Sequence, residues 1–94
     1  MRTTVCKWNA RNPGENTVYI GRPTKWGNPF VIGKDGNREQ VILKYQLWIQ
    51  HPERKHLRNQ ARCELRGKRL ACFCFPLQCH GFVLAAIADS PIEN

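Results

Sequence analysis

Three short apolar runs along the chain predict β-strands. The run from Thr4 to Asn9 and the β-branched run from Thr17 to Ile20 are bounded by turn residues, and Gly21 ends the second run. The segment Leu70–Phe75 is apolar on both of its alternating faces. Such a strand is covered on both sides, as the strands of parallel sheets are. The pattern therefore predicts three strands, the last of them covered on both faces.

A helical period replaces this pattern in three other segments. Glu53–Arg66 predicts a helix because its apolar residues recur every four positions, and Gly67 follows as a stop. Gly81–Ala88 is nearly all apolar and predicts a short buried helix, with residues 89–94 as a tail. An earlier helix begins near Arg38 and ends before Pro52, and its apolar residues share one face: Val41, Ile42, Tyr45, Trp48 and Ile49.

The predicted elements follow in the order β-β-α-α-β-α, which indicates a small α/β fold. We expect a single domain across residues 1–94, with a short, mostly parallel sheet of about three strands packed by about three helices. A right-handed crossover would join the second strand to the third. The loops Arg22–Phe30 and Phe75–Gly81 would then leave the same edge of the sheet, where parallel sheets bind their ligands. We therefore expect these two loops to form one site.

The charge balance points to an anionic partner. The chain carries 15 Lys and Arg residues against 7 Asp and Glu residues, a formal net charge of +8. This excess favours a nucleic acid, another polyanion or an acidic protein face, and a well-solvated basic surface is the alternative. The chain shows neither the apolar start of a signal peptide nor a run of ~20 apolar residues that could span a membrane. We expect a cytoplasmic protein without a membrane partner. In this reducing compartment, the closely spaced cysteines among the five indicate metal binding or thiol chemistry in preference to disulfide bonds.

The closely spaced cysteines near the C-terminus predict a metal or thiol site. The pattern C-x-C-x4-C-H supplies three thiols and one imidazole, the donor set of a structural zinc ion, from Cys72, Cys74, Cys79 and His80. A catalytic interpretation makes Cys74 or Cys79 a nucleophile, with a helix N-terminus and His80 lowering the thiol pKa. In a third interpretation the cysteines are small core residues and His80 caps the helix. The sequence leaves these three interpretations open.

The loop from Arg22 to Phe30 has the composition of a preorganised recognition loop. Pro23, Pro29 and Gly27 forbid a regular element there. Its polar and aromatic residues suit an anionic, nucleotide-like ligand. Arg22 could bind a phosphate or carboxylate with two hydrogen bonds, and Lys25 would add a positive charge. Trp26 could stack on a base, and the Asn28 amide could form hydrogen bonds with its edge. The alternative is structural, with Trp26 in the core and the two cations solvated.

The second predicted helix adds basic residues that could extend a binding surface. Arg58 and Arg62 lie one helical turn apart and are candidates for phosphate contacts. A solvated helix face is the alternative for the same two residues.

Both loops resemble those of a known family. The segments V-Y-I-G-R-P-x-K-W-G-N-P-F (Val18–Phe30) and L-x-C-x-C-x-P-x-x-C-H-G (Leu70–Gly81), with R-E-x-x-x-x-x-Y-x-x-W (Arg38–Trp48) between them, are similar to small domains of bacteria and bacteriophages that are catalogued only as a domain of unknown function. The resemblance covers about residues 18–88. It implies a compact α/β domain with both loops as its hallmark, and it supplies no activity. A phage origin would favour an accessory role in the host cytoplasm.

Three classes of function follow from these observations. The first is a small basic binding domain, stabilised by zinc, that engages a nucleic acid or another polyanion. The second is an enzyme in which Cys74, Cys79 and His80 act with Arg22 and Lys25 on a phosphorylated or nucleotide-like substrate. The third is an inhibitor or adaptor that binds an acidic host protein. The sequence contains no Walker loop and no dinucleotide-binding fingerprint, so the question of catalysis stays open.

Overall fold

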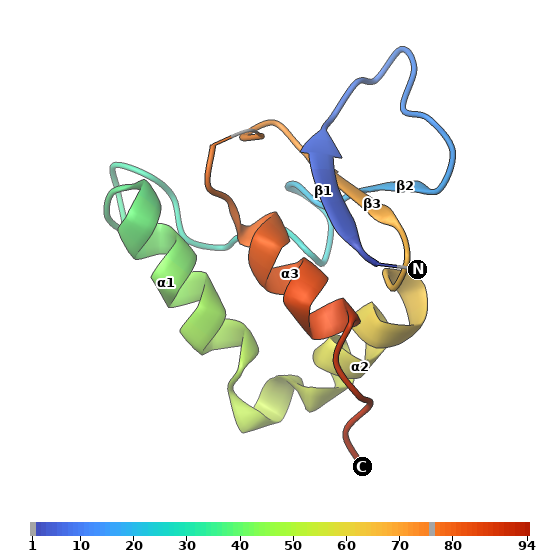
Figure 1. The fold of residues 1–94 in the computed structure, drawn as a ribbon. Helices are drawn as coiled ribbons and strands as arrows, with labels where there is room; N and C mark the ends of the chain where they lie inside the picture. Colours follow the sequence, from blue (N-terminus) through green and yellow to red (C-terminus); the bar gives the residue numbers. More distant parts are fainter. Residues whose placement is uncertain (1, 76) are drawn as a thin grey trace.

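Three parallel strands form one sheet in the computed structural model, which describes residues 2–75 and 77–94 (Figure 1). The strands are β1 (Thr4–Lys7), β2 (Thr17–Tyr19) and β3 (Arg69–Cys72), in the spatial order β1-β3-β2. Because β3 has a neighbour on each edge and packs against other elements, its side chains from Leu70 to Cys72 are buried. The parallel sheet and its covered third strand confirm the prediction from the apolar pattern.

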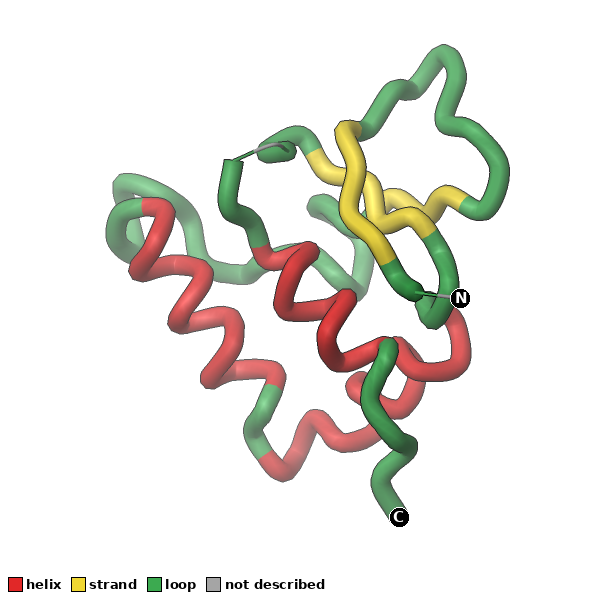
Figure 2. The backbone as a smooth tube through the Cα atoms, in the orientation of Figure 1, coloured by secondary structure: helices red, strands yellow, loops and turns green. Residues whose placement is uncertain are grey.

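The helices complete the predicted order β-β-α-α-β-α. They are α1 (Arg38–Ile49), a short 3-10 helix, η1 (Pro52–Arg54), that leads directly into α2 (Lys55–Glu64), and α3 (His80–Ala88). Figure 2 shows the helices gathered on one side of the sheet, while the loop between β1 and β2 extends away from them. The chain is thus a small α/β domain. None of the helices described for residues 2–75 and 77–94 combines the length and the apolar character needed to cross a membrane.

Helix α3 lies at the centre of the packing and contacts β1, β3, α1 and α2. Its first turn approaches the sheet so closely that a side chain at Gly81 would require the neighbouring side chains to shift. A Cβ atom there would lie 2.9 Å from Ile20 Cδ1 and 3.2 Å from Val5 Cγ1. The core around this contact is formed mainly by fully buried aliphatic and aromatic residues: Ile20, Tyr45, Ile49, Leu65, Leu70 and Leu84.

Helix α1 begins at a well-defined cap and is fixed to the loop that precedes it. The Asn37 side chain accepts a hydrogen bond from the Gln40 backbone, and the Gln40 side chain accepts one in return from the Asn37 backbone, which satisfies amides that the helix leaves unpaired. Within the helix, the Tyr45 hydroxyl donates to the carbonyl of Trp26 at 2.9 Å. This buried bond connects the centre of α1 to the Arg22–Phe30 loop.

The last strand is shorter than the sequence predicted. The apolar run continues to Phe75, but β3 ends at Cys72, opposite the last residue of β1. Beyond this point neither neighbouring strand continues the pairing, and the Phe73 side chain is 62% exposed. The chain bends through Phe73 and Cys74 towards α3.

The segment predicted as a tail is held against the body of the domain. Asp89 accepts hydrogen bonds from the backbone amide and hydroxyl of Thr3. Glu93 forms ion pairs with Arg58 and Arg62 on α2 at 2.6 and 2.7 Å. The C-terminal residues therefore cover one face of α2.

Candidate functional site

A pocket of about 420 Å³ lies at the carboxyl end of the sheet, between the two loops that the sequence singled out. It is lined by residues that follow β2 and β3, by the first turn of α3 and by one face of α1. The predicted residues that it brings together are Arg22, Asn28, Cys72, Cys74, Cys79 and His80. Because β2 and β3 are parallel, both loops leave the same sheet edge, as the sequence predicted.

Two of the cysteines are in direct contact at this pocket. Cys72 is the last residue of β3 and Cys79 is the N-cap of α3, and their Sγ atoms lie 3.0 Å apart. The Cys79 Sγ atom also accepts a hydrogen bond from the Gly81 amide at 3.3 Å. The hydrogen bond from Cys79, with further bonds from the Phe75 and Cys74 backbone, lowers the pKa of Cys72 to about 6 against the effect of burial. The same thiol–thiol bond and burial raise the pKa of Cys79.

His80 connects the start of α3 to the end of the second strand. Its Nε2 atom lies 2.8 Å from the carbonyl oxygen of Ile20, and because a carbonyl only accepts, Nε2 carries the proton. The imidazole packs edge-on against the ring of Tyr45. Burial lowers the pKa of His80, and the neighbouring charge of Arg22 lowers it further, so the ring is neutral at pH 7.

The structure does not test the predicted four-ligand zinc site. Within residues 2–75 and 77–94, no three Cys, His, Asp or Glu side chains converge in a way that could hold a metal ion. The Cys72 and Cys79 thiols contact each other, and Nε2 of His80 is engaged with a backbone carbonyl. Zinc binding by Cys72, Cys74, Cys79 and His80 therefore stays a prediction from the sequence.

Two arginines supply the positive charge of the pocket. Arg22 is exposed at the pocket wall, in the turn from Gly21 to Thr24 that follows β2. Its backbone is fixed by the Tyr19 hydroxyl, which donates to the Arg22 carbonyl at 3.1 Å, and by Gly27, where a Cβ atom would lie 3.1 Å from Arg22 Cα. Arg38 enters from the first turn of α1 and donates to the carbonyl of Gln78 at 3.2 Å. No Asp or Glu occurs among the described lining residues.

The other predicted residues of the first loop have structural contacts. Trp26 is 4% exposed and belongs to the core, so its ring does not offer the open stacking surface that the sequence suggested. Lys25 is not among the lining residues of the pocket and forms an ion pair with Glu64 at 3.0 Å. Asn28 lines the pocket, but its amide donates to the Val41 carbonyl and its carbonyl accepts from the Phe30 amide. The structural alternative for this loop is thus correct for Trp26.

Arg58 and Arg62 do not lie on an open helix face. Both are buried, at 5% and 8% exposure, because Glu93 and Ser90 from the C-terminal segment cover them. Arg58 also donates to the backbone carbonyls of Ile49 and His51. The sequence predicted that these two arginines lie on a solvated or phosphate-contacting surface. The structure corrects this expectation, because both form ion pairs with Glu93 inside the domain.

Arg38 is the pocket residue that reasoning from the sequence missed. The sequence marks it as the start of a predicted helix and as the first residue of the segment R-E-x-x-x-x-x-Y-x-x-W, but indicates no role for it in the site. The signal that could have found it is its position directly after the Asn37 cap, since a first-turn side chain lies at the helix end that faces the loops.

Comparison with known proteins identifies the family of this chain. A family model described as "Domain of unknown function (DUF4326)" matches residues 4–90, so the match includes β1 as well as both pocket loops. The "Uncharacterized 12.4 kDa protein in nrdA-td intergenic region" of Enterobacteria phage T4 is 33% identical over 87 residues, which are 90% of this chain and 79% of that protein. No solved structure matches the chain. The chain therefore belongs to the DUF4326 family of domains of unknown function.

Proposed function

We propose that this domain binds a small anionic molecule, phosphorylated or nucleotide-like, in the pocket between its two loops. The observation that carries the proposal is the charge of the pocket, since two arginines line it and no described lining residue is acidic. A guanidinium presents several N–H donors in one plane and binds phosphate or carboxylate oxygens in pairs. Arg22, from the first loop, and Arg38, from α1, would provide this contact.

The remaining walls favour a ligand with an apolar or aromatic part. Phe30, Val31 and Ile32 come from the first loop, and Val41 and Ile42 come from α1. A volume of about 420 Å³ lies within the range of ~300–1,000 Å³ that is usual for small-molecule sites. A nucleotide with its base against these apolar walls and its phosphate at the two arginines fits the lining and the volume of the pocket.

A thermal-shift and calorimetric titration tests the proposal. Nucleoside monophosphates, the corresponding nucleosides and inorganic phosphate serve as probes. A ligand at ten times its Kd stabilises the folded state by about 1.4 kcal/mol, which raises Tm by roughly 6–11 °C for a domain of this size. We expect at least one monophosphate to bind and its nucleoside to bind far more weakly.

The matched variants are Arg22→Ala and Arg11→Ala. Both residues are exposed and cationic, but Arg11 lies in the loop between β1 and β2 and does not line the pocket. Loss of one phosphate contact should weaken binding on the order of tenfold in Arg22→Ala and leave it unchanged in Arg11→Ala. Equal losses in both variants, or no binding of any monophosphate to the folded protein, would contradict the pocket proposal.

A second candidate, binding to nucleic acid through the surface, is supported by the distribution of charge. Ten Lys and Arg residues are exposed against five exposed Asp and Glu residues. The internal pairing of Arg58 and Arg62 with Glu93 therefore leaves a surface that is still basic. Neutralising phosphates releases counterions, so the logarithm of affinity should fall linearly with the logarithm of salt, with a slope of roughly −0.7 to −0.9 per contact.

Fluorescence anisotropy separates this candidate from the pocket. Binding of labelled oligonucleotides that is steeply salt-dependent and unchanged by a saturating monophosphate would support a surface site. Absence of oligonucleotide binding at low salt would exclude it and favour an acidic host protein as the macromolecular partner.

A further inference from the structure

The proposed anion binding does not involve the contact between Cys72 and Cys79. The two Sγ atoms lie 3.0 Å apart, and a disulfide places them about 2.05 Å apart. A movement of about 1 Å would therefore join them. Both residues sit at the ends of regular elements, Cys72 at the end of β3 and Cys79 at the cap of α3, so the fold itself holds the two thiols together.

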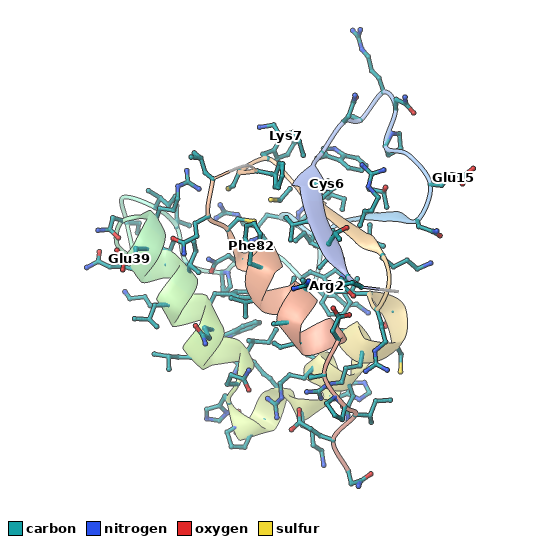
Figure 3. The ribbon with its side chains drawn as sticks, in the orientation of Figure 1. Arg2, Cys6, Lys7, Glu15, Glu39 and Phe82 are labelled. Atoms are coloured by element: carbon teal, nitrogen blue, oxygen red, sulfur yellow. The ribbon has the colours of Figure 1, made fainter. Side chains whose placement is uncertain are left out.

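The pair faces the pocket although each residue is 2% exposed. A small molecule bound in the pocket would therefore lie next to this pair. Two other cysteines do not face the pocket. Cys6 lies on β1, where Figure 3 labels it, and Cys63 is exposed on α2, and neither lines the pocket.

The surroundings distinguish the two thiols. Lys7 is the register partner of Cys72, and its ammonium group donates to the carbonyl of Phe73, next to Cys72 along the chain. This positive charge favours a thiolate at Cys72. Either sulfur can donate in the hydrogen bond between the two thiols, and a thiolate at Cys72 requires Cys79 to be the donor. The Cys79 Sγ atom itself accepts a hydrogen bond from the Gly81 amide. Cys72 is thus placed as the attacking sulfur and Cys79 as the resolving one.

We propose that Cys72 and Cys79 form a redox-active dithiol that reduces small disulfides which enter the pocket. The Cys72 thiolate attacks one sulfur of the substrate disulfide, forms a mixed disulfide and expels the first thiolate. Cys79 then loses its proton to solvent and attacks the Cys72 sulfur, which expels the second thiolate and leaves a Cys72–Cys79 disulfide. Two electrons pass from the protein to the substrate, and the two released thiolates account for both halves of it. Transient disulfides of this kind are compatible with a reducing compartment.

The test uses dithionitrobenzoate, an aromatic disulfide that releases a coloured thiolate. The background is the full chain with Cys6→Ser, Cys63→Ser and Cys74→Ser, which leaves only the pair, and circular dichroism confirms that it is folded. We expect two equivalents of thiolate per protein, with the second released at a rate that does not depend on reagent concentration because its step is intramolecular. Peptide mapping should then show the Cys72–Cys79 disulfide.

Two further variants on the same background assign the roles. Cys79→Ser should release one equivalent and keep a stable mixed disulfide on Cys72. Cys72→Ser should react on the order of tenfold more slowly, because Cys79 lacks the neighbouring charge. Two mixed disulfides on one molecule of the background protein, or no reaction while the protein is folded, would overturn the proposal.

The unsubstituted protein gives an independent measurement. In a glutathione buffer of graded redox potential, the Cys72–Cys79 disulfide should be the first intramolecular disulfide to appear and should be fully reversed by dithiothreitol. If Cys74 pairs in its place, the assignment of the pair is wrong.

Discussion

Replacement of His80 by Leu tests how the site is held together. The imidazole Nε2 donates to the Ile20 carbonyl at 2.8 Å, and Ile20 has no exposed surface. Leucine keeps most of the side-chain volume but leaves this buried carbonyl without its donor. An unsatisfied buried acceptor costs about 1–3 kcal/mol. At about 2 kcal/mol, and with 4–8 °C lost per kcal/mol in a domain of this size, Tm should fall by roughly 8–16 °C.

His80→Gln is the matched control for this experiment. Its amide nitrogen can occupy the position of Nε2 and donate to the same carbonyl. We therefore expect His80→Gln to recover more than half of the Tm that His80→Leu loses. Differential scanning calorimetry in buffer free of metal ions measures both variants against the unsubstituted protein.

Two results would refute this reasoning. If His80→Leu is as stable as the unsubstituted protein, the bond to Ile20 does not contribute to folding. If chelation lowers the Tm of the unsubstituted protein by as much as the Leu substitution does, and has no effect on His80→Leu, then His80 acts as a metal ligand.

Three other predictions concern the C-terminal segment, the predicted metal and the packing of α3. Hydrogen bonds from Arg58, and to a smaller extent from Arg62, lower the pKa of Glu93 to about 2. The ionised Glu93 carboxylate should therefore stabilise the fold fully above about pH 4.5, and this stabilisation should be lost as the pH falls towards 2. Glu93→Gln should flatten this part of the stability profile, while Glu53→Gln should leave it unchanged. Elemental analysis by inductively coupled plasma should find about one zinc per chain if the four-ligand prediction is correct, and a metal-free, fully stable protein contradicts it. Gly81→Ala should destabilise the fold by about 1–3 kcal/mol in urea titrations, because its Cβ atom would lie 2.9 Å from Ile20 Cδ1, and unchanged stability would show that α3 can shift.

The order of elements and the location of the pocket followed from the sequence because both depend on local patterns. The run through Leu70 and Cys72 is apolar on both faces, and only a strand with cover on both sides accommodates this. Once two strands are parallel, the residues that follow them must meet at one sheet edge, which brought Arg22 and the Cys/His cluster to the same pocket.

The tertiary structure decided which polar residues face a ligand and which face the protein. The burial of Arg58 depends on Glu93, which lies 35 residues further along the chain, and no local pattern indicates that contact. Lys25 meets Glu64 across a separation of 39 residues, and Trp26 enters the core because the loop folds onto α1 through Tyr45. Likewise, the spacing of Cys72 and Cys79 suits several kinds of site. Only the position of α3 against β3 places the two sulfur atoms 3.0 Å apart, because long-range packing fixes distances that sequence separation leaves free.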